Sequence, residues 1–214
     1  MRIPFNPTHR LLRPALQLLM LALALPAICV LASADEQFVH MARVSLTEGQ
    51  VSYRRANDAG SDWYDASVNM PLGENDQVFT SPGGRAEVQL TGRNIVRLDY
   101  DTSFKITQFN TNLTQVALAV GTATFRIDSL DPRQFQVVDA RDWNDNDPLY
   151  FEVSTPTAAI TLRKTGIYRI SVRDDGTTEV QVRQGEADVY NKELGSLIVK
   201  QGRAIWIEGK DPGD

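Results

Sequence analysis

The fold is decided by residues 151–207, which read FEVSTPTAAITLRKTGIYRISVRDDGTTEVQVRQGEADVYNKELGSLIVKQGRAIWI. Apolar residues alternate with polar ones in short runs that end at Gly, Pro, Asn or Asp: Phe151/Val153, Ile160/Leu162, Ile170/Val172, Val180/Val182, Ala187/Val189 and Ile205/Ile207. This alternation is typical of short, half-buried strands. Between two runs, Asp174-Asp175-Gly176 predicts a hairpin turn, because glycine accepts the positive φ that such a turn requires. We therefore predict a meander of strands here.

Gly49, Gly121 and Gly185 are each followed by apolar residues at the second and fourth places. This pattern predicts a tight corner that leads into a strand with one buried face. We expect Gly185 in particular to have a positive φ. The intervals between the three glycines are unequal, which indicates recurring strand patterns and argues against a solenoid of fixed period.

The rest of the chain also favours strands. Alternation continues through Ala86–Leu90, Val96/Leu98 and Phe104/Ile106, and residues 110–120 have a period of two from Val116 onward. No segment after residue 34 keeps a helical period over three turns. The predicted fold is all-β: one domain, residues 35–208, of about a dozen short and mostly antiparallel strands in a β-sandwich or a rolled, solenoid-like sheet. Residues 209–214 would begin a linker or tail.

The amino terminus has the pattern of a secretory signal peptide. Arg2, Arg10 and Arg13 precede an apolar run over 16–31, and Ala32-Ser33-Ala34 follows as a small-x-small cleavage site. We predict that residues 1–34 are removed after Ala34 and that the protein is periplasmic or secreted. The run is short for a membrane span of roughly 20 residues, so membrane attachment would require an uncleaved signal anchor.

Removal of this segment would leave 180 residues with 19 basic and 27 acidic side chains, a net charge of −8. That charge argues against nucleic acid or an anionic membrane as a partner. The single cysteine, Cys29, would leave with the signal peptide, so we expect no disulfide and no thiolate chemistry.

Several short motifs resemble the FecR domain of bacterial envelope proteins. They are Thr155-Pro156 before a strand, Gly166-Ile167-Tyr168, the corner from Val182 to Ala187, and Gln201-Gly202. Earlier in the chain, Trp63, Leu72 with Asp76, and Thr80 with Ala86 and Val88 follow the order seen in that family. The chain departs from the family pattern in reading Thr165-Gly166 in place of Gly-Thr and Gln-Gly-Arg at the last turn.

The resemblance implies a non-enzymatic module. In the best-known FecR proteins this domain is the periplasmic half of a transmembrane regulator that senses an outer-membrane transporter and signals to a sigma factor. Only 15 residues precede the apolar run over 16–31, so we expect no cytoplasmic region of that kind. The chain is more similar to exported FecR-like proteins, in which a signal peptide is followed by this domain and often by a long carboxy-terminal tail.

No catalytic motif stands out, so we expect no enzyme, no catalytic or cofactor-binding residues and no cofactor. Histidine is the usual base of nucleophilic triads, but His9 lies in the signal peptide and His40 at the expected flexible start of the domain. Oxygen ligands are densest at Asp139–Asp147, where Asp142, Asn144 and Asn146 match the first positions of a calcium loop. Because Asp147 and Val153 occupy the places of the required Gly and Glu, we interpret the segment as a solvated insertion and expect no metal.

The sequence thus predicts an exported protein-interaction, signalling or scaffold module whose envelope partner it does not identify. Cell-wall or carbohydrate binding is the alternative, with Trp63, Trp143 and Trp206 as its aromatic platforms. Trp63 is expected to pack in the core or at a corner, whereas Trp206 alternates with Ile205 and Ile207 and is expected to face outward. Residues 196–199, SLIV, carry no charge and are expected to form an edge strand that docks a partner or lies under a tail. The strand from Val180 to Arg183 is expected to be interior.

Overall fold

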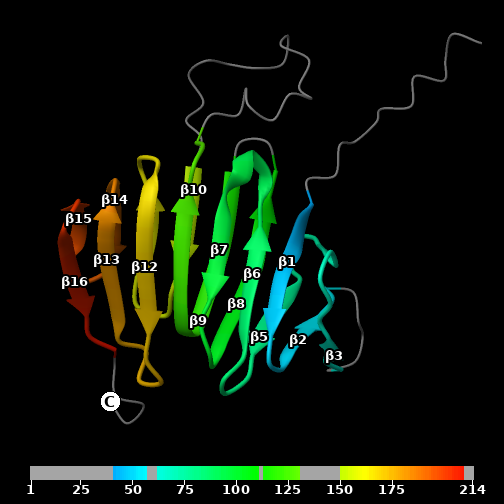
Figure 1. The fold of residues 1–214 in the computed structure, drawn as a ribbon. Coiled ribbons are helices and arrows are strands. Elements are labelled where there is room, and N and C mark those ends of the chain that lie inside the picture. The colour runs from blue at the N-terminus through cyan, green and yellow to red at the C-terminus, as the bar shows by residue number, and fades with distance from the viewer. Residues whose placement is uncertain (1–40, 57–61, 111–112, 131–149, 210–214) are drawn as a thin grey trace, which may run out of the picture. The chain divides into compact units, whose positions relative to one another are not determined.

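The computed structural model describes residues 41–56, 62–110, 113–130 and 150–209, all within the larger of the two units into which the chain divides, 39–214. These residues form strands throughout, with one short 3-10 turn, η1 (Thr91–Arg93), and no α-helix (Figure 1). The strands are β1 (Ala42–Glu48), β2 (Val51–Arg54), β3 (Tyr64–Asp65), β4 (Pro71–Leu72), β5 (Gln77–Thr80), β6 (Arg85–Gln89), β7 (Ile95–Leu98), β8 (Thr102–Phe109), β9 (Leu113–Ile127), β10 (Tyr150–Ser154), β11 (Ala159–Leu162), β12 (Gly166–Val172), β13 (Thr178–Gln184), β14 (Glu186–Asn191), β15 (Gly195–Lys200) and β16 (Arg203–Ile207). The all-β prediction is confirmed, although the described strands outnumber the expected dozen.

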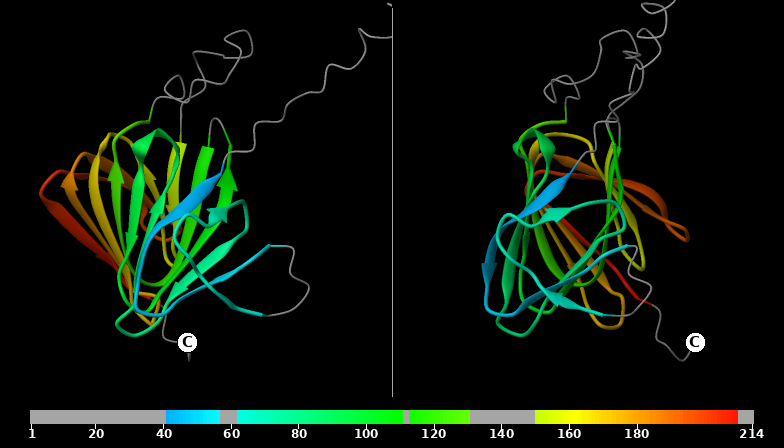
Figure 2. Two further views of the ribbon diagram at one scale, coloured as in Figure 1. Left: turned by 45° about the vertical axis from the view of Figure 1, so that its right-hand side comes forward. Right: turned by 90° about the vertical axis from the view of Figure 1, so that its right-hand side faces the viewer.

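The strands pair into one sheet that folds into two facing layers (Figure 2). Strand β9 belongs to both, because its first half pairs with β8 and β10 and its second half with β7 and β12. The first layer has the order β4-β1-β6-β7-β9-β12-β13-β16, and the second β3-β2-β5-β8-β9-β10-β11-β14-β15. All described pairs are antiparallel except β9 with β10. Of the predicted alternatives, a β-sandwich or a rolled, solenoid-like sheet, the described strands form a single rolled sheet with two facing layers, and it is not a closed barrel.

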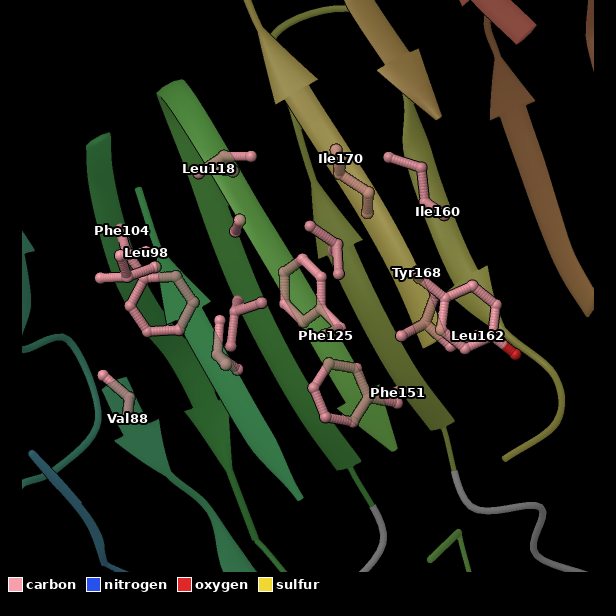
Figure 3. Close-up of a cluster of buried hydrophobic side chains, with 14 of the residues drawn as sticks. Val88, Leu98, Phe104, Leu118, Phe125, Phe151, Ile160, Leu162, Tyr168 and Ile170 are labelled. Carbon is pink, nitrogen blue, oxygen red and sulfur yellow. The ribbon is translucent and has the colours of Figure 1, made fainter. Parts of the chain in front are cut away.

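The core lies between the layers and is built from the predicted alternating residues (Figure 3). Phe125 from the first layer and Phe151 from the second meet edge to face, with ring centroids 6.0 Å apart. The alternating apolar pairs named above for residues 151–207 are buried, apart from Ile205, which is half-buried because β16 is the last strand of its layer. Burial on one face and exposure on the other is the direct consequence of the strand's period of two.

The three predicted glycine corners carry the chain from one layer to the other. Gly49 joins β1 to β2, Gly185 joins β13 to β14, and Gly121 lies where β9 crosses between the layers. Their φ values are +64°, +102° and +93°, in the region that favours glycine. The prediction needs correction at Gly121, which lies inside one long strand and does not separate two strands.

Local turns follow the sequence closely. Gly176, with φ of +81°, turns the predicted hairpin between β12 and β13. The described part of the strand expected over 110–120 begins at Leu113, whose amide donates to Oδ1 of Asn110 at 3.0 Å.

Candidate functional site

Asp76 lies just before β5 and ties together the segments that follow β2 and β4. Its buried carboxylate accepts hydrogen bonds from the amides of Gly73 (2.9 Å) and Ala56 (3.1 Å) and from Nη1 of Arg55 (2.6 Å). Arg55 also donates to the Pro71 carbonyl at 2.8 Å. A buried charge needs such a full set of partners, so this ion pair fixes three chain segments together.

Threonine hydroxyls hold the crossing of β9. Oγ1 of the buried Thr80 donates to the Asp99 carbonyl (2.5 Å) and accepts the Thr102 amide (2.9 Å). Oγ1 of Thr102 in turn accepts the Thr122 amide at 3.0 Å. A Cβ on Gly121 would lie 2.4 Å from that oxygen, so only glycine fits at the crossing.

Tyr168 closes the corner at Gly185. Its buried hydroxyl donates to the Lys164 carbonyl at 2.5 Å and accepts the Glu186 amide at 3.1 Å. Burial raises the pKa of Tyr168, and the hydrogen bonds to these two residues only partly offset that effect. The hydroxyl therefore stays protonated and acts as a structural link between β12 and β14.

Trp63 lies on the outer surface of the second layer. Its ring contacts Phe79 edge-on at 6.1 Å between centroids, and the Arg54 guanidinium lies 5.1 Å from its centroid. The side chain is 41% exposed, so of the two expected positions, core or corner, the core is excluded. Tyr64 pairs with Tyr53, which packs against the core, so Tyr64 lies on the core-facing side of the sheet. Side chains alternate between the two faces of a strand, so Trp63, the preceding residue, faces outward.

Trp206 faces outward, as predicted, from the outermost strand of the first layer, and 57% of it is exposed. It borders a surface hollow with Arg173, Asp175, Thr177 and Glu208. The Thr177 amide donates to Asp175 at 2.8 Å and lowers the pKa of that carboxyl. The hollow thus combines an aromatic face with charged side chains of both signs.

The segment 196–199 forms part of β15, the last strand of the second layer (Figure 1). The expectation of an edge is confirmed, since β14 is the only described strand with which β15 pairs. Leu194 is 78% exposed, Leu197 55% and Ile198 41%. The expected interior position of Val180–Arg183 is also confirmed, because β13 lies between β12 and β16.

Other candidates fall outside the described residues: the signal peptide, His9, Cys29, His40, Trp143 and the possible calcium loop at Asp139–Asp147. Within the described ranges, no three His, Cys, Asp or Glu side chains are placed to hold a metal ion. The described part of the chain also contains no helix long and apolar enough to cross a membrane.

Comparison with known proteins gives one decisive match. The sequence model of the FecR family, described as "FecR protein", matches residues 76–188, more than half of the chain. The chain belongs to the FecR family.

Two crystal structures of one protein from Parabacteroides distasonis ATCC 8503, described as a "putative anti-sigma factor", match this FecR structure with a TM-score of 0.48 and 18% sequence identity. Each match covers 63% of this chain and 55% of the other, so it spans little more than half of that protein. No curated protein matches the chain.

The FecR motif residues are structural parts of this fold. Leu72, Ala86 and Val88 are buried in the core, and Asp76 and Thr80 use their polar atoms on internal hydrogen bonds. Sequence reasoning missed the roles of Arg55 and Thr102. A usable signal existed, because Thr80, Thr102 and Thr178 occupy core-facing places where strand alternation requires apolar residues.

Proposed function

We propose that this FecR protein is a non-enzymatic interaction module of the cell envelope with a signalling or scaffold role. The observation that carries the proposal is the family match over residues 76–188, because membership of the FecR family supports a regulatory role. Within the described residues, the polar motif side chains Asp76, Thr80 and Tyr168 are engaged in the fold's own hydrogen bonds, which favours binding over catalysis.

The proposed location is the periplasm or the exterior, after export by residues 1–34. It rests on the basic, apolar and small-residue pattern of that segment. The partner would be another envelope protein, met at an exposed surface.

In-cell photo-crosslinking of the full chain tests this proposal. A crosslinking residue would replace Trp63 on the second layer, Trp206 on the first layer or Tyr100 in the loop between β7 and β8, all exposed. We expect one discrete envelope protein to be captured from one face and not from the others. Absence of any adduct at all three positions, with export intact, would contradict the proposal.

Glycan binding is a second candidate, favoured by the hollow beside Trp206. Sugars stack on exposed aromatic rings, and Arg173, Asp175 and Glu208 would offer hydrogen bonds to hydroxyls. Isothermal titration with soluble peptidoglycan fragments should show binding that Trp206→Ala abolishes and Trp63→Ala, the matched control on the other layer, preserves. Equal loss in both variants, or no binding to the unmodified protein, would count against it.

A further inference from the structure

Four strands of the described residues have a neighbour on one side only, and three of them carry features that prevent further pairing. Strands β3 and β4 have two residues each, and β4 begins with Pro71. In β16, Arg203 stands opposite Val182, in the row of residues that faces the core. Short length, proline and inward-facing charge are the usual protections of a sheet edge.

Strand β15 has none of these protections. It has six residues, no proline, no acidic residue and one charge, Lys200, at its end. Leu197 lies opposite the buried Val189 on the core-facing side, and Ile198 lies opposite Asp188 on the outer side. Both apolar side chains are nevertheless exposed. The edge therefore offers unpaired backbone groups together with apolar side chains on both faces, which is the chemistry of a strand-addition site.

We propose that β15 pairs antiparallel with β15 of a second copy of this chain, with Ile198 on the two-fold axis. In this register Ile198 faces the second copy's Ile198, Leu197 faces the second copy's Val199, and Ser196 faces the second copy's Lys200. Apolar residues meet apolar residues, and the one charge meets a hydroxyl. The pairing extends the second layer from one copy into the next.

The neighbouring symmetric registers are less complementary. Centring the pair on Leu197 places Lys200 opposite Leu194, and centring it on Val199 places Lys200 opposite Ile198. Cross-strand partners contribute when they match in polarity. The register centred on Ile198 is therefore the one selected by the side chains.

Charge also favours this register. The Ser196 hydroxyl donates to Oδ1 of Asp188, and the other carboxylate oxygen of Asp188 is bound by Arg163 at 3.1 Å. Lys200 of the second copy, opposite Ser196, would lie beside that Oδ1. Each dimer would contain this contact twice, and it opposes the repulsion between two chains that each carry a net charge of −5.

One pair of six-residue strands buries less than the roughly 800 Å² per partner of a standard interface. A dissociation constant in the micromolar range is therefore expected. Sedimentation velocity of the protein purified from cells expressing the full chain, from about 1 to about 500 µM, should show a monomer becoming a dimer, a range that brackets the expected constant.

The decisive test uses charge at position 198. Ile198→Lys places two like charges opposite each other and should raise the dissociation constant at least tenfold, and Ile198→Glu should do the same. Mixing the two variants places Lys opposite Glu and should restore the dimer. Val68→Lys is the control, because Val68 is a similarly exposed apolar residue outside the strands.

The proposal is supported if each variant alone is monomeric and the mixture dimerises. It is overturned if the unmodified protein stays monomeric throughout, if Ile198→Lys dimerises as well as the control, or if the mixture fails to dimerise. A monomer whose β15 amides are protected from hydrogen exchange would assign the edge to another segment of the chain. The inference does not depend on the proposed function, because envelope crosslinking can succeed or fail whatever the result of sedimentation.

Discussion

Replacing Gly185 by alanine tests whether the corner between the layers is fixed by its glycine. The residue has φ of +102°, and a Cβ built there would lie 2.2 Å from Oη and 2.8 Å from Cζ of Tyr168. Both distances are too short for any real contact, and Tyr168 is fully buried with its hydroxyl bound on two sides. The tyrosine ring or the corner must therefore move.

The cost can be estimated in three parts. A non-glycine residue at such a φ costs about 1–3 kcal/mol, overpacking a core costs about 1–3 kcal/mol, and a weakened Tyr168 hydrogen bond costs about 1 kcal/mol. We expect Gly185→Ala to lower the free energy of unfolding by about 3–7 kcal/mol, measured by urea denaturation. For a domain of this size that corresponds to a fall in Tm of roughly 6–28 °C.

Gly202 provides the matched control, because its φ is +76° and its Cβ would meet nothing within 4 Å. Gly202→Ala should therefore lower the free energy of unfolding only by the backbone part, about 1–3 kcal/mol. Tyr168→Phe removes the nearest atom, so the double variant Gly185→Ala, Tyr168→Phe should be more stable than the sum of the single changes predicts. Equal losses for Gly185→Ala and Gly202→Ala would refute the collision with Tyr168.

Three further predictions concern pH, the buried ion pair and export. Because the pKa of Tyr168 is raised in the folded state, its hydroxyl contributes to folding stability below about pH 10, and this contribution is lost as pH rises through the folded pKa. The difference in the free energy of unfolding between the unmodified protein and Tyr168→Phe, measured by urea denaturation, should therefore become smaller above about pH 10. A difference that stays constant with pH would contradict this. Asp76→Ala strands the Arg55 charge and two amides and should cost about 3 kcal/mol or more in the same assay, whereas the exposed control Asp62→Ala should cost under about 0.5 kcal/mol. Ala34→Leu should block signal cleavage, because the peptidase accepts small residues at that site; amino-terminal sequencing of the exported unmodified protein should begin at Asp35, and Met1 there would refute cleavage.

Residue patterns predict the parts of this fold that depend on neighbours along one strand. The face of Ile160, Leu162, Val180 and Val182 follows from strand parity alone. The glycine corners could be predicted because a positive φ favours glycine wherever in the chain it is required. Parity could not place Trp63, because β3 has two residues and no alternating pattern to read.

Pairing between distant segments could not be predicted in this way. Gly121 predicted a corner, but nothing local showed that β9 continues through it as one strand shared by both layers, because the crossing is held by the hydroxyls of Thr80 and Thr102 from other strands. The choice of β15 as an edge was within reach, since an uncharged SLIV segment near the domain end differs from the charged strands around it. The pairing of β15 with β14 could not be predicted from the sequence, because pairing order depends on contacts across the whole sheet.

The same division explains why the family motif identifies the fold more readily than the partner. Asp76, Thr80 and Tyr168 lie inside, where their hydrogen bonds satisfy groups that would otherwise be buried without partners. The exposed residues Leu197, Ile198, Trp206 and Trp63 lie on edges and outer faces, where strand periodicity imposes no residue type. These surface positions can therefore differ between proteins that share the interior, and the partner of this chain must be found by experiments on its edges and outer faces.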